Sequence, residues 1–275
     1  MRVIISFKEQ CCVKYSIVKN DYPESLDLAK QLINQLASDQ EWVVDDQNPD
    51  YVFVIGGDGT FLKAVNQFNH LLEQIKFYPI KKGGIGFYTN RNLFDSKDLK
   101  TNLNLDECQI NKYPLLEVMV DEQKFFIINE LKVLNDVVPQ QFSIFVNDQK
   151  LEDFKGTGVV FATPSGSTGY LKSINGAIIY PTSQELFEMQ EVAPVSTVLF
   201  NTINAPIIFS GQETIKLTQI DSPKVNAALT VVADARIIGT TFTTIEIKIS
   251  AIKLKIITTN KINRATLLKD IFVGN

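Results

Sequence analysis

The pattern of apolar residues changes partway along this chain, and the change limits the folds it can adopt. Over about the first ninety residues, strand-like runs alternate with helix-like patterns, which favours parallel βα units with helices packed on a sheet. From about Lys112 onward, short β-rich runs follow one another with polar turns between them, a pattern typical of antiparallel hairpins. The sequence therefore predicts an α/β amino-terminal domain, Rossmann-like and built of parallel βα units, followed by a β-rich, sandwich-like carboxy-terminal domain.

The domain boundary is expected between residues 90 and 112, and we place it so that residues 1–100 form the α/β domain and residues 101–275 the β-rich domain. Roughly the last 20 residues are a candidate for packing back on the first domain. No long Gly/Ser-rich or Pro-rich linker separates the two parts. We therefore expect the domains to pack closely, with a cleft between them.

Several elements of the first domain can be predicted individually. Strands are expected at RVIISF, WVVDD and YVFVI. A helix after Pro23 would bury an apolar stripe made of Leu26, Ala29, Leu32, Ile33 and Leu36. A second helix from Thr60 would bury Phe61, Leu62, Val65, Phe68, Leu72 and Ile75.

Composition excludes several classes of protein. The net charge of -4 among 275 residues gives no basic signal for nucleic acid. No apolar run approaches the roughly 20 residues of a membrane span, and Lys8 and Glu9 interrupt the only candidate for a signal-peptide core. We therefore expect a cytoplasmic protein. The three cysteines, Cys11, Cys12 and Cys108, lack CxxC spacing, so neither a disulfide framework nor a protein-bound metal site is predicted.

The stretch VIGGDGTF at residues 54–61 places Asp58 among three glycines directly after an apolar run. A strand that ends in a glycine turn and restarts as a helix can bring main-chain amides up to a phosphate. A carboxylate at that corner can accept a proton from an attacking hydroxyl. The chain has no GxxxxGK[ST] and no complete GxGxxG, so neither a P-loop nor ordinary dinucleotide binding is supported.

A second cluster, ATPSGSTGYLKS at residues 162–173, combines hydroxyl side chains with Tyr170. The hydroxyls and exposed amides can bind a nucleotide, and the tyrosine ring offers a stacking face. The simpler interpretation is a Ser/Thr turn that caps a short helix.

A third candidate is Asn129-Glu130, where two polar residues interrupt an apolar, strand-like stretch. Adjacent residues of a strand point to opposite faces, so at least one of them would face a buried or ligand-lined surface. His70, the only histidine, lies in the predicted helix after the glycine turn and is expected to be a surface or packing residue.

Together these motifs resemble the NAD kinase family. GGDGTFL at 56–62, GGIGFYTN at 83–90, NE at 129–130, KGTGVVFATPSGSTGY at 155–170, NGAIIYP at 175–181 and ADA at 233–235 occur in the family's order and span nearly the whole chain. GGDG is shared with lipid kinases, whereas TPSGSTGY preceded by NE is more specific.

The resemblance implies transfer of a phosphoryl group from ATP to the 2'-hydroxyl of the adenosine ribose of NAD. It implies that Asp58 acts as the general base, that a divalent cation, usually magnesium, arrives with ATP, and that the protein is a homo-oligomer, a dimer or tetramer. The residues that it implies for nucleotide binding are Gly57, Gly59, Phe87, Asn129, Glu130, Lys155, Thr157, Ser165, Thr168, Gly169, Tyr170, Leu171, Lys172, Ser173 and Ala193.

The chain also departs from the family's pattern. Lys155-Gly156-Thr157-Gly158 stands where the family commonly has Arg-Gly-Asp-Gly, so a carboxylate expected at the substrate is missing. Ala235 follows Asp234 where glycine or histidine is usual. Two alternatives to an NAD kinase stay open: a lipid kinase, because GGDGT is shared with that class, and a regulatory protein that binds NAD without catalysis, because Thr157 stands in place of the carboxylate.

Overall fold

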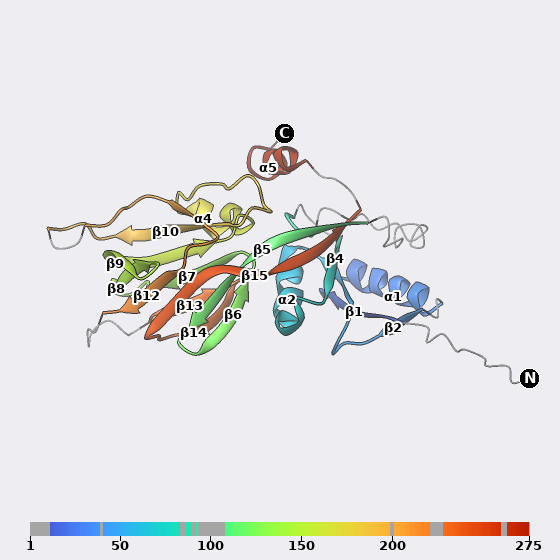
Figure 1. The fold of residues 1–275 in the computed structure, drawn as a ribbon. Coiled ribbons are helices and arrows are strands. Elements are labelled where there is room, and N and C mark those ends of the chain that lie inside the picture. Colours follow the sequence, from blue (N-terminus) through green and yellow to red (C-terminus); the bar gives the residue numbers. More distant parts are fainter. Residues whose placement is uncertain are drawn as a thin grey trace, which may run out of the picture. The chain divides into compact units, whose positions relative to one another are not determined.

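The computed structural model describes residues 12–38, 41–82, 86–89, 92, 108–198, 201–220, 228–259 and 263–274. Spatial proximity divides the chain into two units, each described separately below. The first comprises Met1–Asn111 and Lys255–Asn275, and the second comprises Lys112–Leu254. Within the described residues the protein is a mixed, sheet-rich fold with a few helices (Figure 1).

The first unit contains a parallel sheet. Its strands are β1 (Val13–Lys19), β2 (Trp42–Val44), β3 (Tyr51–Gly56) and β4 (Lys76–Lys81), and they lie in the order β2-β1-β3-β4. The end of β15 (Thr244–Thr258) joins this sheet beside β4, where Ile256 pairs with Phe77. Helix α1 (Pro23–Ala37) follows β1, and helix α2 (Asp58–Gln67) follows β3. A 3-10 turn, η1 (Asn69–Leu71), and the terminal helix α5 (Arg264–Phe272) complete the unit.

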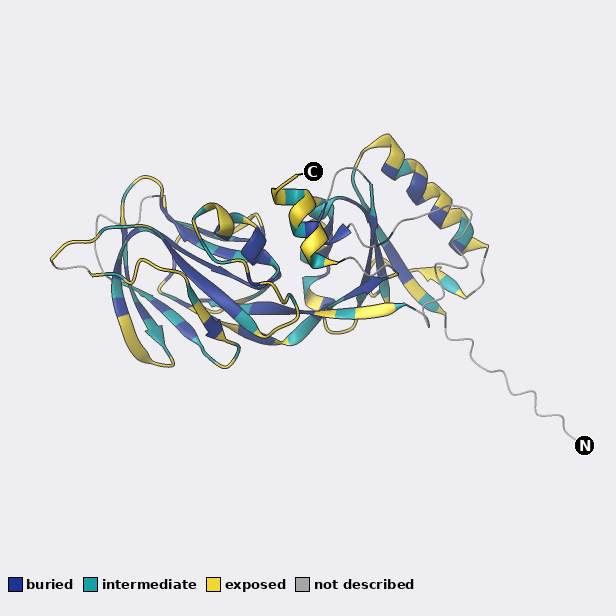
Figure 2. Ribbon diagram, turned by 90° about the horizontal axis from the view of Figure 1, so that it is seen from above, coloured by how far each residue is buried: buried dark blue, intermediate teal, exposed yellow. Residues whose placement is uncertain are grey.

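The register of this sheet explains how it buries both faces. Phe53 pairs with Tyr78, and both pack with the buried stripe of α1, which includes Leu28 and Leu32. Alternate residues point the other way: Phe77, one position before Tyr78, meets Phe61 of α2 with their ring centroids 5.7 Å apart. The two helices therefore cover opposite faces of the sheet. In Figure 2 the sheet side of α1 is buried and its outer side is exposed.

Several predictions for this unit need correction in detail. The strand predicted at RVIISF lies outside the described residues. Strand β1 was not predicted, because Lys14, Ser16 and Lys19 interrupt its apolar residues. In α1 the buried stripe runs through Leu28 rather than Ile33, whose side chain is 42% exposed. Helix α2 ends at Gln67, so Leu72 and Ile75 are buried beyond the helix rather than on it.

The second unit consists mainly of antiparallel strands. Its longest continuous order is β14-β13-β7-β9-β8-β12-β15, while β10 pairs with β9 and β11, and β5 pairs with β6 and β15. The strand bounds are β5 (Gln109–Val120), β6 (Gln123–Ile127), β7 (Glu130–Leu134), β8 (Gln140–Val146), β9 (Gln149–Ala162), β10 (Leu186–Pro194), β11 (Ile207–Ser210), β12 (Ile215–Gln219), β13 (Thr230–Ala233) and β14 (Arg236–Gly239). A short 3-10 helix, η3 (Gly166–Thr168), and α4 (Tyr170–Ser173) follow β9. A large apolar core, including Phe142, Phe154 and Phe161, holds these strands together.

The β-rich character predicted for this part of the chain agrees with these strands, but their limits differ. The predicted run KFFIINELKV is two strands, β6 and β7, separated by Ile128 and Asn129. TTIEIKIS and KLKIIT are one continuous strand, β15. Strand β10 was missed, because Glu188, Gln190 and Glu191 interrupt its apolar pattern even though all three are buried.

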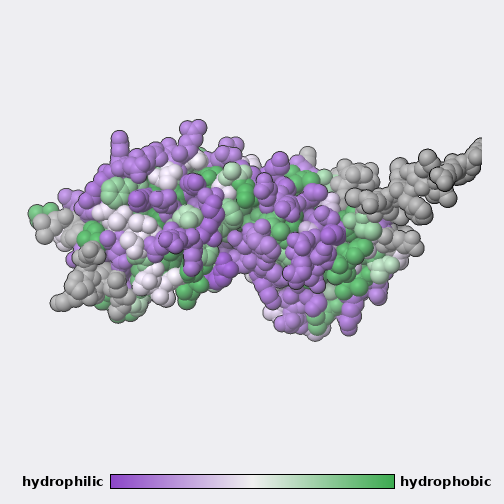
Figure 3. All heavy atoms as spheres, turned by 60° about the horizontal axis from the view of Figure 1, so that its bottom comes forward, coloured by the Kyte–Doolittle hydropathy of each residue, from purple (hydrophilic) through white to green (hydrophobic). Residues whose placement is uncertain are grey.

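Within the described residues, no helix is long and apolar enough to cross a membrane. Hydrophilic side chains cover much of the face drawn in Figure 3, with scattered apolar side chains between them. Cys12 and Cys108 form no disulfide in the described structure.

Candidate functional site

The glycine turn of the first unit lies between β3 and α2, at the corner predicted for Asp58. Gly56 has φ +153°, and a Cβ at that position would lie 2.5 Å from the Thr60 hydroxyl, so this glycine is required by the backbone itself. In contrast, a Cβ on Gly57 or Gly59 would meet no described atom within 4 Å. The backbone at these two glycines is open to a ligand.

The Asp58 carboxylate is held by the segment that follows β4. Its Oδ2 accepts the N–H of Phe87 at 2.7 Å. Its Oδ1 accepts the N–H of Tyr88 at 3.1 Å and both the N–H and the hydroxyl of Thr89 at 3.3 Å. A carboxylate oxygen has about two acceptor sites, so Oδ1 is saturated among the described residues while Oδ2 keeps capacity for one more donor.

Gly86 makes this arrangement possible. A Cβ at Gly86 would lie 2.6 Å from Asp58 Oδ1 and 2.5 Å from Thr89 Oγ1. The motif GGIGFYTN was visible in the sequence, but no local pattern identified Gly86 as the residue that leaves room for the carboxylate. Phe87, predicted to line the nucleotide pocket, donates its N–H to Asp58 while its ring centroid lies 5.9 Å from that of Phe272 in α5.

In the second unit, Asn129 and Glu130 lie where β6 gives way to β7. The buried carboxylate of Asp234 accepts the N–H groups of Ile128 and Asn129 at 2.8 and 2.7 Å, and the Asp234 N–H donates to the Glu130 carbonyl. Burial raises the pKa of Asp234 to about 7, although the two N–H donors oppose the shift. Asp234 therefore fixes the backbone that presents the Asn129-Glu130 pair.

The TPSGSTGY segment is attached to the same backbone. Thr163 donates its N–H to the Asn129 carbonyl at 2.9 Å and its hydroxyl to the Ile128 carbonyl. A Cβ at Gly166 would lie only 2.1 Å from the Asn129 carbonyl oxygen, so this glycine allows the two segments to touch. Neither Asp234 nor Thr163 was predicted to organise the site, although the ADA and TPSG motifs that contain them are visible in the sequence.

Most hydroxyls of this segment bond to nearby backbone, as the simpler interpretation of a Ser/Thr turn predicts. The Ser167 hydroxyl bridges the Pro164 carbonyl and the Ile179 N–H, while Thr168 and Ser173 donate to carbonyls three residues earlier. Ser165 differs, because its buried Oγ has no hydrogen-bond partner among the described residues.

Glu130, Gly169 and Tyr170 lie together. A Cβ at Gly169 would lie 3.3 Å from Glu130 Oε2, and the Lys132 ammonium lies 4.8 Å from the centroid of the Tyr170 ring. Burial raises the pKa of Glu130, and the nearby Lys132 opposes the shift. Of the remaining predicted residues, Leu171 is fully buried and its carbonyl accepts the N–H groups of Ile174 and Gly176, whereas Lys172 is exposed.

Lys155 and Thr157 lie on β9, and Ala193 lies on the neighbouring strand β10. A Cβ at Gly156 would lie 2.8 Å from the Ala193 carbonyl, and Ala193 has φ +44°. The structure therefore brings Lys155 and Ala193 together. Val192, the residue before Ala193, packs against the same apolar cluster as Tyr170 and pairs with Gly158, the residue after Thr157.

One further buried acid supports this region and was missed. Glu188 on β10 is fully buried and accepts the Ala177 N–H at 2.6 Å, and burial raises its pKa to about 7. It holds the NGAII segment that follows α4. No group of three or more His, Cys, Asp or Glu side chains able to hold a metal ion occurs among the described residues.

Known proteins with similar sequences are NAD kinases. Residues 130–259 match a family model described as the ATP-NAD kinase C-terminal domain. An NAD kinase from Enterococcus faecalis is 34% identical over 217 residues, covering 76% of this chain and 81% of the relative. The NAD kinase of Lactobacillus johnsonii is 32% identical over 210 residues, covering 74% and 77%.

Solved structures share the fold. Yeast NADH kinase complexed with NADH matches with a TM-score of 0.73 at 18% identity, covering 96% of this chain and 88% of that one. An NAD kinase from Archaeoglobus fulgidus in complex with ATP matches with a TM-score of 0.69 at 18% identity, covering 95% and 98%. The matches to the two sequence relatives cover 77% and 81% of the relatives' own lengths. This chain therefore belongs to the NAD kinase family.

Proposed function

We propose that this protein transfers the terminal phosphoryl group of ATP to the 2'-hydroxyl of the adenosine ribose of NAD, giving NADP and ADP. The observation that carries the proposal beyond family membership is the glycine turn with Asp58. There, a fixed carboxylate with a remaining acceptor site stands between two glycines whose backbone is open. Membership in the NAD kinase family argues against the lipid kinase alternative.

In the proposed reaction the ribose 2'-oxygen attacks the terminal phosphorus of ATP as the bond to the bridging oxygen breaks. The hydroxyl proton passes to Asp58 Oδ2, and ADP leaves with the electron pair of the broken bond. A positioned carboxylate of this kind contributes roughly 10²- to 10⁴-fold. The divalent cation enters as part of the metal–ATP substrate and neutralises charge on the transferring phosphate.

The second unit is proposed to bind the nucleotide acceptor. Asn129, Glu130, Ser165, Thr168, Gly169, Tyr170, Leu171, Lys172 and Ser173 supply its adenosine contacts in this proposal. Glu130 is well suited to bind the ribose. Burial raises its pKa because the carboxylate has lost hydrogen bonds to water, and a pair of sugar hydroxyls could donate in place of that water. Tyr170 provides a face on which the adenine ring can stack. This face is the side of the ring opposite Lys132, or the same side if the Lys132 side chain moves away.

The proposal also includes the domain bounds, the oligomeric state and the location of the protein. They are a Rossmann-like α/β domain at residues 1–100, a sandwich-like domain at 101–275, a homo-oligomer and a cytoplasmic location.

The direct test is an NADP-forming assay of the purified protein with NAD and Mg²⁺, supplied in parallel with ATP or with inorganic polyphosphate. We expect NADP to accumulate with at least one donor, and a matching quantity of ADP when ATP is used. Calorimetric NAD binding without NADP formation from either donor, over a range of metal concentrations, would favour the non-catalytic regulatory alternative.

A further inference from the structure

The order of strands in the first unit marks a place where ligands of parallel sheets commonly bind. In the order β2-β1-β3-β4, the chain moves from β1 to one side and from β3 to the other, so the order reverses between β1 and β3. Ligands of open α/β sheets bind outside the carboxyl ends of the strands at such a point. Asn20, just after β1, meets the end of β3 here: its N–H donates to the Ile55 carbonyl, and a Cβ at Gly56 would lie 2.9 Å from Asn20 Nδ2.

Two helices begin at this edge without a side-chain cap. Neither Tyr22, the N-cap of α1, nor Gly57, the N-cap of α2, accepts a capping hydrogen bond. Helix amino ends carry a partial positive charge and unsatisfied N–H groups, which favour anions. The 15 residues of α1 and the 10 residues of α2 are long enough for this effect.

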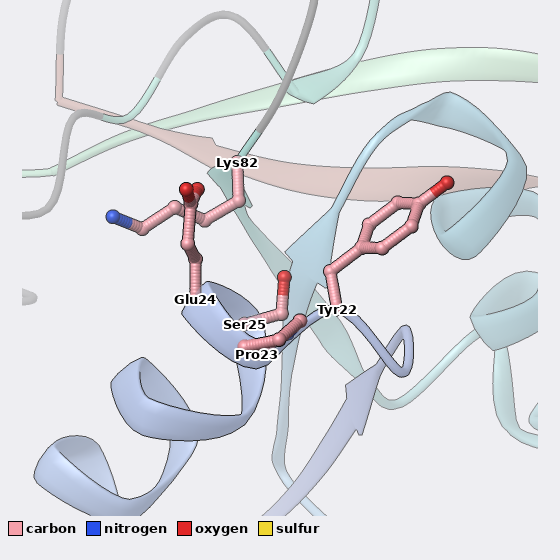
Figure 4. A pocket seen from close by; sticks show the side chains of 5 residues that line it. All are labelled: Tyr22, Pro23, Glu24, Ser25 and Lys82. Atoms are coloured by element: carbon pink, nitrogen blue, oxygen red, sulfur yellow. The ribbon is translucent and has the colours of Figure 1, made fainter.

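A cavity of about 270 Å³ lies at the amino end of α1, lined by Tyr22, Pro23, Glu24, Ser25 and Lys82. Ser25 has a relative exposure of 0%, yet its hydroxyl has no hydrogen-bond partner among the described residues. Figure 4 shows this hydroxyl pointing away from α1, into the space between Tyr22 and Lys82. A buried hydroxyl without a partner is destabilising, so a ligand acceptor there would recover stability.

Lys82 supplies the positive charge of the cavity. It directly follows β4, and its N–H donates to the Gly56 carbonyl at 3.4 Å, which ties it to the glycine turn. Lys82 makes no ion pair in the described part of the chain. Glu24, which also lines the cavity, carries the opposing charge.

We propose that the cavity at the amino end of α1 is the subsite that binds the polyphosphate chain of the phosphate donor, with Lys82, the Ser25 hydroxyl and the Glu24 N–H as its donors. The cavity is smaller than a pocket for a whole ligand, which suits part of a nucleotide or of inorganic polyphosphate. This inference rests on the proposed phosphotransfer, because it assigns the donor to the unit that carries Asp58. Glu24 limits the affinity for this anion.

The test measures binding of inorganic tripolyphosphate and of Mg-ATP by calorimetry in the absence of NAD, together with steady-state KM values for ATP and NAD. We expect Lys82→Met to weaken both ligands by at least about 10-fold and Ser25→Ala by about 3- to 10-fold, as for hydrogen bonds to charged groups. Lys82→Arg should restore most of the affinity, and Glu24→Gln should tighten it. The KM for NAD should change less than about 2-fold in these variants, because they remove contacts to the phosphate donor and none to NAD.

Lys30→Met is the matched control, since it removes the same charge from an exposed position on α1. Wild-type affinity for both anions in Lys82→Met and Ser25→Ala, with unchanged KM for ATP, would overturn the inference while leaving the proposed function intact. Conversely, Lys82-dependent tripolyphosphate binding by a protein that makes no NADP would keep the anion site and remove the proposed reaction.

Discussion

Replacing Glu152 with glutamine should make the protein more stable at alkaline pH. The side chains of Glu152 and Glu191 are only 7% and 3% exposed. Each carboxylate accepts one N–H from the loop before β11, Ile203 at 3.0 Å and Asn204 at 2.9 Å. Burial, followed by the neighbouring Glu191 carboxyl, raises the pKa of Glu152 to about 8 from an ordinary value of 4.5.

The magnitude and sign follow from this shift. An increase from 4.5 to about 8 is 3.5 pKa units, and at 1.36 kcal/mol per unit it corresponds to at most about 5 kcal/mol. Because the folded state keeps its proton to higher pH than the unfolded state, the free energy of unfolding falls between about pH 4.5 and pH 8 and then levels off. Glutamine keeps an acceptor for the Ile203 N–H and cannot ionise. The variant should therefore gain about 2–4 kcal/mol on the wild type at pH 9, and little at pH 5.

The assay is urea unfolding at pH 5, 7 and 9, with Glu246→Gln as the control because Glu246 is an exposed glutamate on β15. The control should shift stability by less than about 0.5 kcal/mol at every pH. A stability difference between Glu152→Gln and wild type that stays constant from pH 5 to pH 9 would refute the assigned protonation.

Three other substitutions test the site geometry. Gly86→Ala should displace the Asp58 carboxylate and lower kcat at least about 10-fold, because the new Cβ would lie 2.6 Å from Asp58 Oδ1; wild-type kcat would show that this contact does not matter. Gly57→Ala should leave the melting temperature within about 2 °C but raise the KM for ATP, since its Cβ meets no described protein atom; an unchanged KM would mean that no phosphate approaches this glycine. Ala235→Gly should stabilise the protein by about 0.5–1 kcal/mol in urea unfolding, because Ala235 has φ +63° in the β13–β14 turn; a loss of stability would contradict the strain assigned to that turn.

Short-range sequence patterns predicted many of the strands and helices. The apolar run YVFVI and the glycines after it predicted a strand, a turn and a helix, and β3 and α2 follow that order with Asp58 at the corner. In the second unit, alternation predicted strand character along most of the chain. It failed where polar residues are buried, as at Glu188 and Glu191 of β10, because one oxygen of each carboxylate accepts an N–H from outside the strand, from Ala177 and Asn204.

The candidate site was predictable by motif but not by contact. No local pattern reveals that Asp58 would accept hydrogen bonds from residues 87–89, since the contact depends on the parallel pairing of β3 and β4. The role of Asp234 is similar, because it reaches back more than a hundred residues to the Asn129 backbone. The empty space at Ser25 and Lys82 likewise arises only when the ends of β1 and β4 are brought to one edge of the sheet.

The central claim is that the Asp58 carboxylate accepts the proton of the ribose hydroxyl, and single-turnover NADP formation by Asp58→Asn tests it most directly. The control is Thr89→Val, which removes one hydrogen bond to Oδ1 and leaves the carboxylate in place. We predict that Asp58→Asn keeps the fold and NAD binding but lowers the rate at least about 10²-fold, whereas Thr89→Val lowers it less than about 10-fold. A near-normal rate in Asp58→Asn would contradict the account.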